Sequence, residues 1–306
     1  MLPNCMNRNG KQPLQHLAWS LSKSCFFREG RRLWKENQSN SQLSLSKFQK
    51  VIVGAYLILQ DFSEGIFPPT FEDQQKVYDR EISYSLQWPG LSVEDSFEVA
   101  QMKPFWFSSP GFQYLSDFVA VSSCLKKINV TPSMKLLELG CGTGWMSEFL
   151  AIMGFEVVGS TLSPHDIRAA NMRVESLKVK GFDKKLSFIQ TPMESIEKSL
   201  ENDSIGTFDC IYVYEALHHA YNWQQTIESC STCLKSGGWL LICNEPNLIH
   251  TMVSYRVSVL SETHEIGFNR SQLIAHIEKS GFRKPKILKN RIGFGIFPLW
   301  IAAQKR

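Results

Sequence analysis

The stretch that decides the fold is residues 135–145, which read KLLELGCGTGW. A short apolar run that contains Glu138 leads into a turn with glycine at 140, 142 and 144, and a helical pattern follows. Glycine lets such a turn bend sharply and approach a ligand closely, because a Cβ atom would clash there. A strand, a glycine turn and a helix in this order predict the first βαβ unit of a parallel sheet.

Short apolar segments alternate with amphipathic helical segments from this stretch to the end of the chain. The expected strands are 135–139, 156–160, 186–190, 208–213, 239–243, 286–292 and 298–304. Helix-start signals stand between them, such as Ser163 followed by Pro164 and Asp166, and Asn222 followed by Gln225. The pattern predicts an α/β fold: a Rossmann-like, doubly wound, mostly parallel seven-stranded sheet with helices on both faces, preceded by a helical N-terminal extension.

Three parts are expected along the 306 residues. Residues 1–50 form a basic, flexible extension, 51–130 a helical region that acts as a lid or substrate cap, and 131–306 the doubly wound domain. The helical region ends with a helix entered from Pro110-Gly111 and stopped at Thr131-Pro132. Its apolar face is formed by Tyr114, Phe118, Val121, Leu125 and Ile128.

Composition excludes several classes of protein. Hydrophobic residues make up 43% and charged residues 20% of the chain, which is the range of globular proteins and not of disordered or collagenous ones. The longest apolar run, residues 51–59, is far short of the about 20 residues of a membrane span, so no span is expected.

The eight cysteines are expected to be thiols. The amino terminus has no charged segment followed by an apolar stretch of the secretory kind, so we expect the chain in a reducing compartment and assign it to the cytoplasm. Only Cys230 and Cys233 make a C-x-x-C pair, and no second pair or histidine cluster completes a zinc site. No metal is therefore expected.

Charge is distributed unevenly along the chain. Residues 1–50 hold nine lysines and arginines against two glutamates, a net charge of +7, whereas the rest of the chain sums to −3. Such a basic segment could contact nucleic acid, an anionic membrane surface or an acidic partner. Because it is rich in Asn, Gln and Ser and lacks interleaved aromatic residues, a solvated extension is favoured, with an organellar transit peptide as an alternative.

The acid before the glycine turn narrows the choice of ligand. In an open α/β sheet, ligands bind beyond the carboxyl ends of the strands, where Glu138 and the turn should lie. A dinucleotide fold presents this turn to an anionic pyrophosphate, which has no use for a carboxylate. A cationic amino group, such as that of the methionine part of S-adenosylmethionine, does have a use for one.

From about residue 131 to its end, the chain resembles a class I S-adenosylmethionine-dependent methyltransferase, with a domain of the methyltransferase type 11/12 kind. LLELGCGTGW (136–145), EVVGSTLSP (156–164), FDCIYVYEALHH (208–219) and LKSGGWLLICNEP (234–246) are similar to family motifs in order and spacing. The resemblance implies that S-adenosylmethionine is the cofactor and that its methyl group goes to a small-molecule or lipid-like acceptor.

The resemblance also implies which residues hold the cofactor. Glu138 and the turn Gly140, Cys141, Gly142, Thr143 and Gly144 would hold the methionine end, with Cys141 as a small side chain and not a nucleophile. Thr161 and Leu162 would lie at the ribose, Met193 and Glu194 at the adenine, and the backbone at Tyr214 at the amino acid. The family commonly has an acid where this chain has Thr161, and its T-L-S-P segment is similar to that of cyclopropane fatty acid synthases.

Three titratable residues follow the fourth expected strand: Glu215, His218 and His219. Histidine is the usual proton acceptor for a hydroxyl, so these residues are the catalytic candidates, with His219 slightly favoured over His218. Two alternatives stay open: a histidine could only cap the strand, and Glu215 could pair with a helix N-terminus or position the cofactor.

Specificity is expected from two groups of residues outside the motifs. One group lies before residue 131 and the other follows the fifth strand: Tyr84, Trp88, Phe105, Trp106 and Phe107, then Asn247, His250, Tyr255, Arg256 and His264. They would form an acceptor pocket or a lid packed on the sheet.

Three other functions remain as alternatives. The first is methylene transfer to a lipid alkene, as in cyclopropane synthases, and the second is a non-catalytic binding module on the same fold. A nucleic-acid methyltransferase is less favoured, because E-A-L-H-H stands where an N-P-P-Y-like motif would be needed. The identity of the acceptor and the oligomeric state are left open.

Overall fold

The computed structural model describes residues 12–39, 45–69, 73–86, 92–105, 109–181, 186–201, 204–289 and 298–306. Its centre is a seven-stranded sheet in the order β3-β2-β1-β4-β5-β7-β6. The strands are β1 (Lys135–Leu139), β2 (Glu156–Thr161), β3 (Leu186–Gln190), β4 (Phe208–Tyr214), β5 (Leu234–Glu245), β6 (Lys286–Ile287) and β7 (Leu299–Gln304). Strands β1 to β5 are parallel and β7 is antiparallel to both of its neighbours, which confirms the doubly wound sheet.

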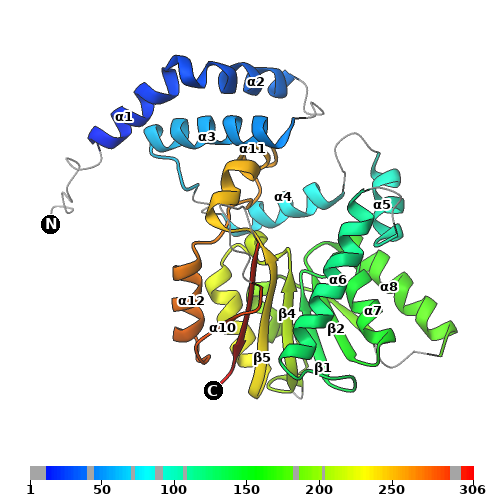
Figure 1. Cartoon of the computed structure of the whole chain (residues 1–306). Helices are drawn as coiled ribbons and strands as arrows, with labels where there is room; N and C mark the ends of the chain where they lie inside the picture. The colour runs from blue at the N-terminus through cyan, green and yellow to red at the C-terminus, as the bar shows by residue number, and fades with distance from the viewer. Residues whose placement is uncertain are drawn as a thin grey trace.

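Helices cover both faces of the sheet (Figure 1). On one face, α6 (Ser109–Lys127), α7 (Trp145–Ile152) and α8 (Pro164–Val179) pack on strand residues such as Leu136 and Tyr212. On the other, α10 (Trp223–Cys233) and α12 (Arg270–Lys279) pack on residues such as Leu137 and Ile211. Adjacent strand residues point to opposite faces, so β1 to β5 and β7 contribute to both hydrophobic clusters.

The helix-start signals of the sequence are present in the structure. The Ser163 hydroxyl accepts a hydrogen bond from the Asp166 amide at 3.3 Å, and Pro164 is the first residue of α8. The Asn222 side chain accepts one from the Gln225 amide at 3.1 Å. Some strand bounds differ from those expected. β5 begins at Leu234 and not at residue 239, because Leu234 pairs with Phe208 before a register shift in the strand pair. Of the strand expected over 286–292, β6 contains Lys286–Ile287.

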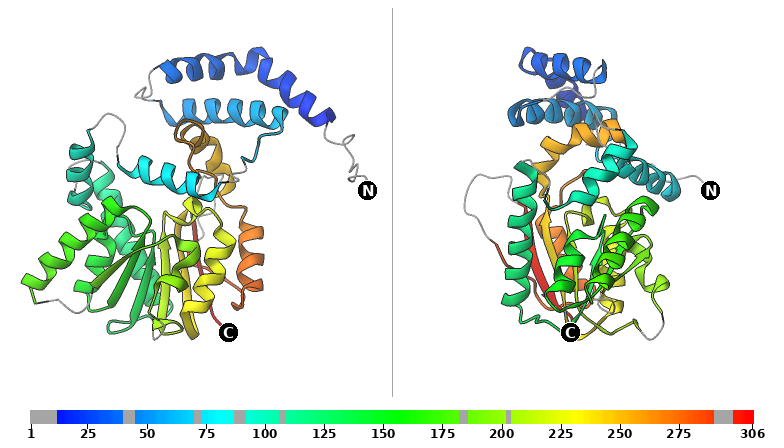
Figure 2. Two further views of the ribbon diagram at one scale, coloured as in Figure 1. Left: turned by 180° about the vertical axis from the view of Figure 1, so that it is seen from behind. Right: turned by 90° about the vertical axis from the view of Figure 1, so that its right-hand side faces the viewer.

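A helical layer lies at the end of the sheet where the parallel strands finish (Figures 1 and 2). It consists of α1 (Gln12–Lys23), η1 (Cys25–Phe27), α2 (Arg28–Ser39), α3 (Lys47–Glu64) and α11 (Thr251–Ser261). Helix α3 packs on α11, where the Tyr255 hydroxyl donates a hydrogen bond of 2.6 Å to Asp61. Two further helices, α4 (Gln74–Leu86) and α5 (Val93–Met102), connect this layer to α6.

The helical layer differs from the expectation for residues 1–50. Residues 12–39 form helices that pack on α3 and bury Leu33 and Phe27 in a cluster with Tyr56 and Tyr255, instead of forming a solvated extension. The expected boundary at residue 50 falls inside α3, which begins at Lys47. The apolar face of α3 is covered by α1 and α2 and by α11, and the composition of residues 1–50 does not indicate these contacts.

The remaining short elements complete the edge of the sheet near the strand ends. They are η2 (Met193–Ser195), α9 (Ile196–Ser199), η4 (Leu217–His219) and η5 (Leu248–His250). Of the eight cysteines, the seven in the described part of the chain are free, which includes Cys230 and Cys233. None of the described helices is long and apolar enough to cross a membrane. A cytoplasmic location stays a prediction.

The contact between α3 and α11 leads to a testable prediction. A Cβ atom on Gly54 would lie 2.0 Å from the Met252 carbonyl oxygen of α11, so Gly54→Ala forces the two helices apart. Although alanine otherwise favours a helix, overpacking should lower the free energy of unfolding by about 2 kcal/mol in urea denaturation. Gln60→Ala in the same helix is the control and should not destabilise the chain. Equal stability of the Gly54→Ala variant and wild type would contradict the packing described here.

Candidate active site

A cavity of about 600 Å³ lies beyond the carboxyl ends of β1, β2 and β4. Helix α4 forms one wall through Glu81, Ile82, Tyr84 and Ser85. The other walls come from α6, the glycine turn, the end of β2, the start of α8 and the turns around η2 and η4. Their residues are Tyr114, Gly140, Gly142, Thr161, Leu162, Ser163, Asp166, Met193, Glu215, Ala216 and His219. The position at the reversal of strand order is where this fold binds its ligands. We call it the cofactor cavity.

The three glycines of the turn have positive φ angles, and two of them line the cofactor cavity. At Gly142, with φ +50°, an added Cβ would meet nothing within 4 Å, so the open space of the cavity lies against the backbone. At Gly140 a Cβ would come within 2.4 Å of Ala216, and at Gly144 within 2.4 Å of Phe188. The turn therefore offers bare backbone to a ligand, while Gly140 and Gly144 allow close packing.

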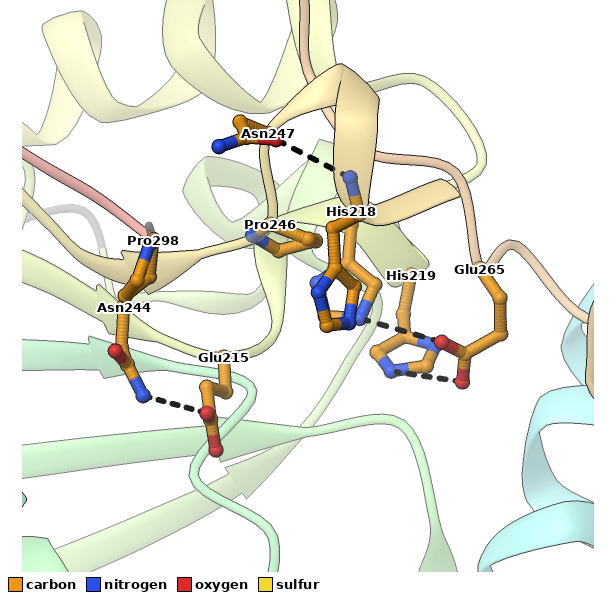
Figure 3. A pocket seen from close by; sticks show the side chains of 9 residues that line it. Glu215, His218, His219, Asn244, Pro246, Asn247, Glu265 and Pro298 are labelled. Atoms are coloured by element: carbon orange, nitrogen blue, oxygen red, sulfur yellow. Dashed lines mark hydrogen bonds and ion pairs between the residues drawn. The ribbon is translucent and has the colours of Figure 1, made fainter. Parts of the chain in front are cut away.

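A second cavity of about 330 Å³ adjoins the first. Polar and charged residues dominate its walls: Glu215, His218, His219, Asn244, Pro246, Asn247, His250, Glu265 and Pro298. Figure 3 shows Glu265 facing both imidazole rings, with Glu215 and Asn244 on the opposite side of the cavity. We call it the polar cavity. Glu215 and His219 line both cavities, so the two meet at these side chains.

The turn that carries these residues is held by one buried carboxylate, Glu245 of β5. Its oxygens accept hydrogen bonds from the amides of Ala216 at 2.8 Å and Leu217 at 2.9 Å, and pair with His218 Nδ1 at 2.8 Å. Burial acts to raise the pKa of Glu245, but the bonds to His218 and to the backbone amides outweigh burial and hold the pKa below its usual value. Glu245 thus stays charged and fixes the end of β4.

His219 lies between carboxylates from two other elements. Its Nδ1 is 3.1 Å from Glu81 Oε2 of α4, and its Nε2 is 3.9 Å from Glu265. Burial lowers the pKa of His219, whereas the pairing with Glu81 raises it. The charges of Glu265 and Glu245 add to the second effect, and the pKa rises to about 9. The imidazole is therefore protonated at neutral pH and is poorly suited to accept a further proton, the role that the sequence favoured for it.

Glu215 is better suited to take a proton. Its backbone has a positive φ of +47°, which turns the side chain into the space between the cavities, and Asn244 donates a hydrogen bond to its carboxylate. Burial raises the pKa of Glu215, the nearby charges of Asp117 and Glu245 add to this, and the pKa is about 7. A carboxylate with a pKa near neutrality is what general-base chemistry needs.

The polar cavity also holds a group that could ligate a metal ion. Among the described residues, ligand atoms of His218, His219 and Glu265 lie within 4.8 Å of one another. Both Nε2 atoms lie 3.9 Å from Glu265 oxygens, while the Nδ1 atoms face Glu245 and Glu81. Carboxylates behind histidines in this way orient metal ligands in other proteins. No metal was predicted from the sequence, because no histidine cluster stands beside Cys230 and Cys233; Glu265 comes to the two histidines only in the folded chain.

Several residues expected at the cofactor are not on the cavity wall. Glu138 is buried under the turn, where its carboxylate accepts hydrogen bonds from Ser147 and, at 2.8 Å, from the Tyr212 hydroxyl. Burial raises the pKa of Glu138 to about 7. Cys141 is buried, and Thr143 donates a hydrogen bond to the Ala100 carbonyl, which ties the turn to α5.

Glu194 and Tyr214 also contact protein and not the cavity. The Glu194 carboxylate accepts hydrogen bonds from the Asn222 amide at 3.0 Å and from the Tyr78 hydroxyl at 3.2 Å, so it links α10 to α4. The Tyr214 hydroxyl donates to Asp117 of α6 at 2.8 Å. Gly140, Gly142, Thr161, Leu162 and Met193 do line the cofactor cavity.

The residues expected to give specificity divide between different surroundings. Tyr84 lines the cofactor cavity, and Asn247 and His250 line the polar cavity. Tyr255 and Arg256 instead bond to Asp61 and Asn37 and fasten α11 to the helical layer. The backbone amide of His264 donates a hydrogen bond to the Glu81 carboxylate, and Phe105 packs on Phe149. Trp88, Trp106 and Phe107 lie outside the described residues.

Three residues at the site were missed by sequence reasoning as functional residues: Glu81, Asp166 and Glu245. Asp166 was noted only as a helix-start residue, yet it lines the cofactor cavity. Burial raises the pKa of Asp166 to about 6, with Lys103 acting in the opposite direction. Glu245 had a weak signal, since it is an acidic residue at the end of a buried strand. Glu81 had none, because only the approach of α4 brings it to His219.

Comparison with known proteins identifies the domain. A family model described as a methyltransferase domain matches residues 137–242, which contain the glycine turn, the ends of β2 and β4, and most of β5. Residues 137–242 are a class I S-adenosylmethionine-dependent methyltransferase domain.

Curated relatives of the methyltransferase domain share a name. The ubiquinone biosynthesis O-methyltransferase of Colwellia psychrerythraea is 27% identical over 184 residues, which cover 56% of this chain and 70% of that protein. The mitochondrial ubiquinone biosynthesis O-methyltransferase of Rattus norvegicus is 32% identical over 128 residues, 42% of this chain and 34% of that protein. The match thus spans about a third of the rat protein.

Solved structures show the same fold around the methyltransferase domain. Magnesium protoporphyrin IX methyltransferase from Synechocystis PCC 6803 superposes with a TM-score of 0.54 at 14% identity, over 75% of this chain and 99% of that chain. Geranyl diphosphate C-methyltransferase from Streptomyces coelicolor A3(2) gives 0.52 at 15% identity, over 78% and 100%.

The contact between Glu81 and His219 predicts a change in the titration of the imidazole. Glu81→Gln removes the carboxylate that raises the pKa of His219, so the midpoint should move from about 9 towards the ordinary 6.5 in an NMR titration of the histidine ring. A raised histidine pKa stabilises the fold below pH 6.5, and this stabilisation is lost as pH rises through 9. The unfolding free energy of wild type should therefore fall more steeply over this interval than that of the variant.

The matched control is Glu262→Gln. Glu262 pairs with Arg80, which also belongs to α4, but Glu262 does not pair with His219. This variant should leave the His219 midpoint where it is in wild type. A His219 that titrates near 6.5 in the wild-type chain would contradict the electrostatic description of the site.

Proposed function

We propose that the chain transfers the methyl group of S-adenosylmethionine to a hydroxyl group of a small, lipid-like acceptor. The observation that carries this proposal is the meeting of the two cavities at Glu215 and His219. A methyl donor in the cofactor cavity and an acceptor in the polar cavity would face each other across these side chains. Methyl transfer needs this arrangement, because donor and acceptor atoms must be held in line while water is excluded.

The residues of the cofactor cavity fit S-adenosylmethionine. Gly140 and Gly142 present bare backbone to the methionine end, and the open space at Gly142 is what a closely held ligand would occupy. Asp166 lies with Thr161 and Leu162 in the wall where the ribose would bind. It supplies the carboxylate that this family commonly has at position 161, and Met193 lies at the adenine. When bound, the cofactor supplies an electrophilic methyl group on a sulfonium centre.

Residues behind the wall support the cofactor cavity indirectly. Glu138 holds β4 and α7 together through Tyr212 and Ser147 and so fixes the turn from below. Glu194 bonds to Tyr78 of α4, which lines the cavity, and Thr143 bonds to Ala100 of α5, so each ties a helix to the sheet domain. Gly144, Cys141 and Tyr214 keep the surrounding chain closely packed. These residues position the binding surface without direct contact to the cofactor.

Glu215 takes the proton of the acceptor hydroxyl in the proposed mechanism. Its carboxylate lies where the cavities meet, and its pKa of about 7 leaves a large deprotonated fraction at neutral pH. His219, protonated beside it, stabilises the negative charge that develops on the acceptor oxygen. His218, fixed by Glu245, orients the acceptor from the far side of the polar cavity.

Two further observations support a hydroxyl acceptor. The polar cavity offers Asn247 and His250 as hydrogen-bonding groups in addition to the charged residues. The names of the curated relatives specify O-methylation in ubiquinone biosynthesis, which favours a hydroxyl on a quinone-type, lipid-like precursor.

The alternatives have less support. The T-L-S-P segment that motivated alkene chemistry has a structural explanation, since Ser163 caps α8 and Pro164 is its first residue. A non-catalytic module would need no titrating carboxylate where two cavities meet. A nucleic-acid acceptor is not favoured by any observation on the site.

The glycine turn gives a direct test of cofactor binding. Gly142→Ala places a methyl group in the cofactor cavity, so the dissociation constant for S-adenosylhomocysteine should rise at least about tenfold by calorimetry. Gly206→Ala is the matched control, because Gly206 also has positive φ and open space around its Cβ position but does not line the cavity. No binding by folded wild-type chain would contradict the proposed function, and equal binding by both variants would contradict the cofactor position.

The base is tested by methyl transfer from labelled S-adenosylmethionine to alkyl-substituted catechols and quinols as probe acceptors. Glu215→Gln should lower the rate at least about a hundredfold and leave S-adenosylhomocysteine binding unchanged within a few fold. Since the deprotonated carboxylate is the active form, the wild-type rate should rise with pH through about 7. Glu228→Gln, an exposed carboxylate on α10, is the control. Full activity of the Glu215→Gln variant would exclude Glu215 as the base.

A further inference from the structure

The outermost helix of the molecule exposes a row of apolar side chains. Leu14, Leu17 and Leu21 of α1 follow one another at steps of three and four residues, so they share one face of the helix. They are 59%, 54% and 43% exposed, and Phe26 of η1, directly after α1, is 82% exposed. Single exposed apolar residues are ordinary, but a row of four within thirteen residues is not. We call these four residues the α1 stripe.

The α1 stripe does not hold α1 on the rest of the chain. Ala18 and Ser22, which lie on another side of the helix, are buried and face the interior of the helical layer. Phe27 is buried in the cluster under α2, which directs its neighbour Phe26 outward. The Arg31 guanidinium donates to the Ser24 carbonyl at 3.1 Å and fixes this turn. The exposed side chains are thus held in place by contacts that do not use them.

Basic residues accompany the α1 stripe. Residues 12–50 carry seven lysines and arginines against two glutamates. Lys23 and Arg28 flank Phe26 in sequence and are exposed, and Lys35 is exposed on α2. Both glutamates of this segment pair with a single residue, Arg32. The other basic residues are therefore not neutralised by acids of the same segment.

An exposed apolar row within a basic segment matches one partner chemistry best, the interface of an anionic bilayer. Leucine and phenylalanine side chains enter the boundary between headgroups and acyl chains, while lysine and arginine contact phosphate groups. A second copy of the chain would bring the same positive charge against itself. A single-stranded nucleic acid would call for several stacking aromatic rings, whereas the stripe is mostly leucine.

The position of the layer is compatible with such a contact. Figures 1 and 2 show α1 and α2 as the outermost elements, on the far side of α3 from the sheet. They lie towards the same end of the molecule as the carboxyl ends of the parallel strands, where both cavities are found. We propose that the α1 stripe and its neighbouring basic residues bind the surface of an anionic membrane, with the chain held at the surface and no segment crossing it. This inference does not depend on the proposed methyl transfer.

Vesicle flotation of the full chain tests the inference. The probes are vesicles of phosphatidylcholine alone and of phosphatidylcholine mixed with phosphatidylglycerol. Binding should be at least about tenfold stronger to the mixed vesicles and should weaken as salt is raised, since anionic lipid attracts each basic residue. Equal binding to both kinds of vesicle, or no binding to either, would overturn the proposal.

Two variants separate the contribution of the apolar stripe to vesicle binding from that of the basic residues. Leu14→Gln/Leu17→Gln/Leu21→Gln keeps side chains of similar helix propensity and should weaken binding to the mixed vesicles about tenfold or more. Lys23→Glu/Arg28→Glu should weaken it to a similar degree at low salt. The control is Val119→Gln/Ile152→Gln/Val179→Gln, which removes three exposed apolar residues elsewhere and should bind as wild type does.

Each variant is checked by circular dichroism and by S-adenosylhomocysteine binding, which should match wild type. Unchanged vesicle binding of the leucine variant would overturn the role of the stripe. So would a wild-type dimer in light scattering that the leucine variant converts to a monomer, since a second copy of the chain would then cover this surface. A chain that binds vesicles without binding S-adenosylhomocysteine would refute the proposed methyl transfer and leave this inference standing.

Discussion

The buried carboxylate of Glu245 is the contact on which the rest of the site depends. The chain leaves β4 at Glu215 with a positive φ angle and turns sharply through η4, which leaves the amides of this turn without partners in the sheet. Glu245, at the end of the neighbouring strand, accepts these amides and His218 together. An unpaired charge or amide at this depth would be costly, so the pairing is strongly determined. The result is a rigid turn that presents Glu215 and His219 to two cavities.

A second carboxylate, Glu81, links helix α4 to the catalytic candidate His219. Glu81 lies on α4, which walls the cofactor cavity, and it reaches both His219 and the backbone amide of His264. The charge on His219 therefore depends on α4 being in place. A site of this kind is complete only when the helix is closed over it, which suits a reaction that must exclude water.

Features that depend on a few neighbouring residues were predicted correctly from the sequence, whereas contacts between segments far apart in the chain were not. The glycine turn and the start of α8 are recognisable because they depend on backbone angles and caps within a few residues. Glu245 lies 29 residues from the amide of Ala216 that it holds, and no local pattern records that contact. Glu138 was expected to hold the methionine end of the cofactor, and in the structure its carboxylate accepts a hydrogen bond from Ser147 of the following helix. The helices before α3 were missed because the basic, polar composition of residues 12–39 favoured a solvated extension, whereas their few apolar residues pack on α3.

The most direct test of this account is the Glu245→Gln variant, assayed for methyl transfer and for S-adenosylhomocysteine binding side by side. Glutamine keeps the size of the side chain and one accepting oxygen, but its amino group cannot accept from the His218 amide or keep the charged pairing with the His218 ring, both of which use the second carboxylate oxygen. The expected result is a rate at least about a hundredfold lower with cofactor affinity within a few fold of wild type. Transfer at the wild-type rate by this variant would show that the turn does not need its buried carboxylate and would contradict the account.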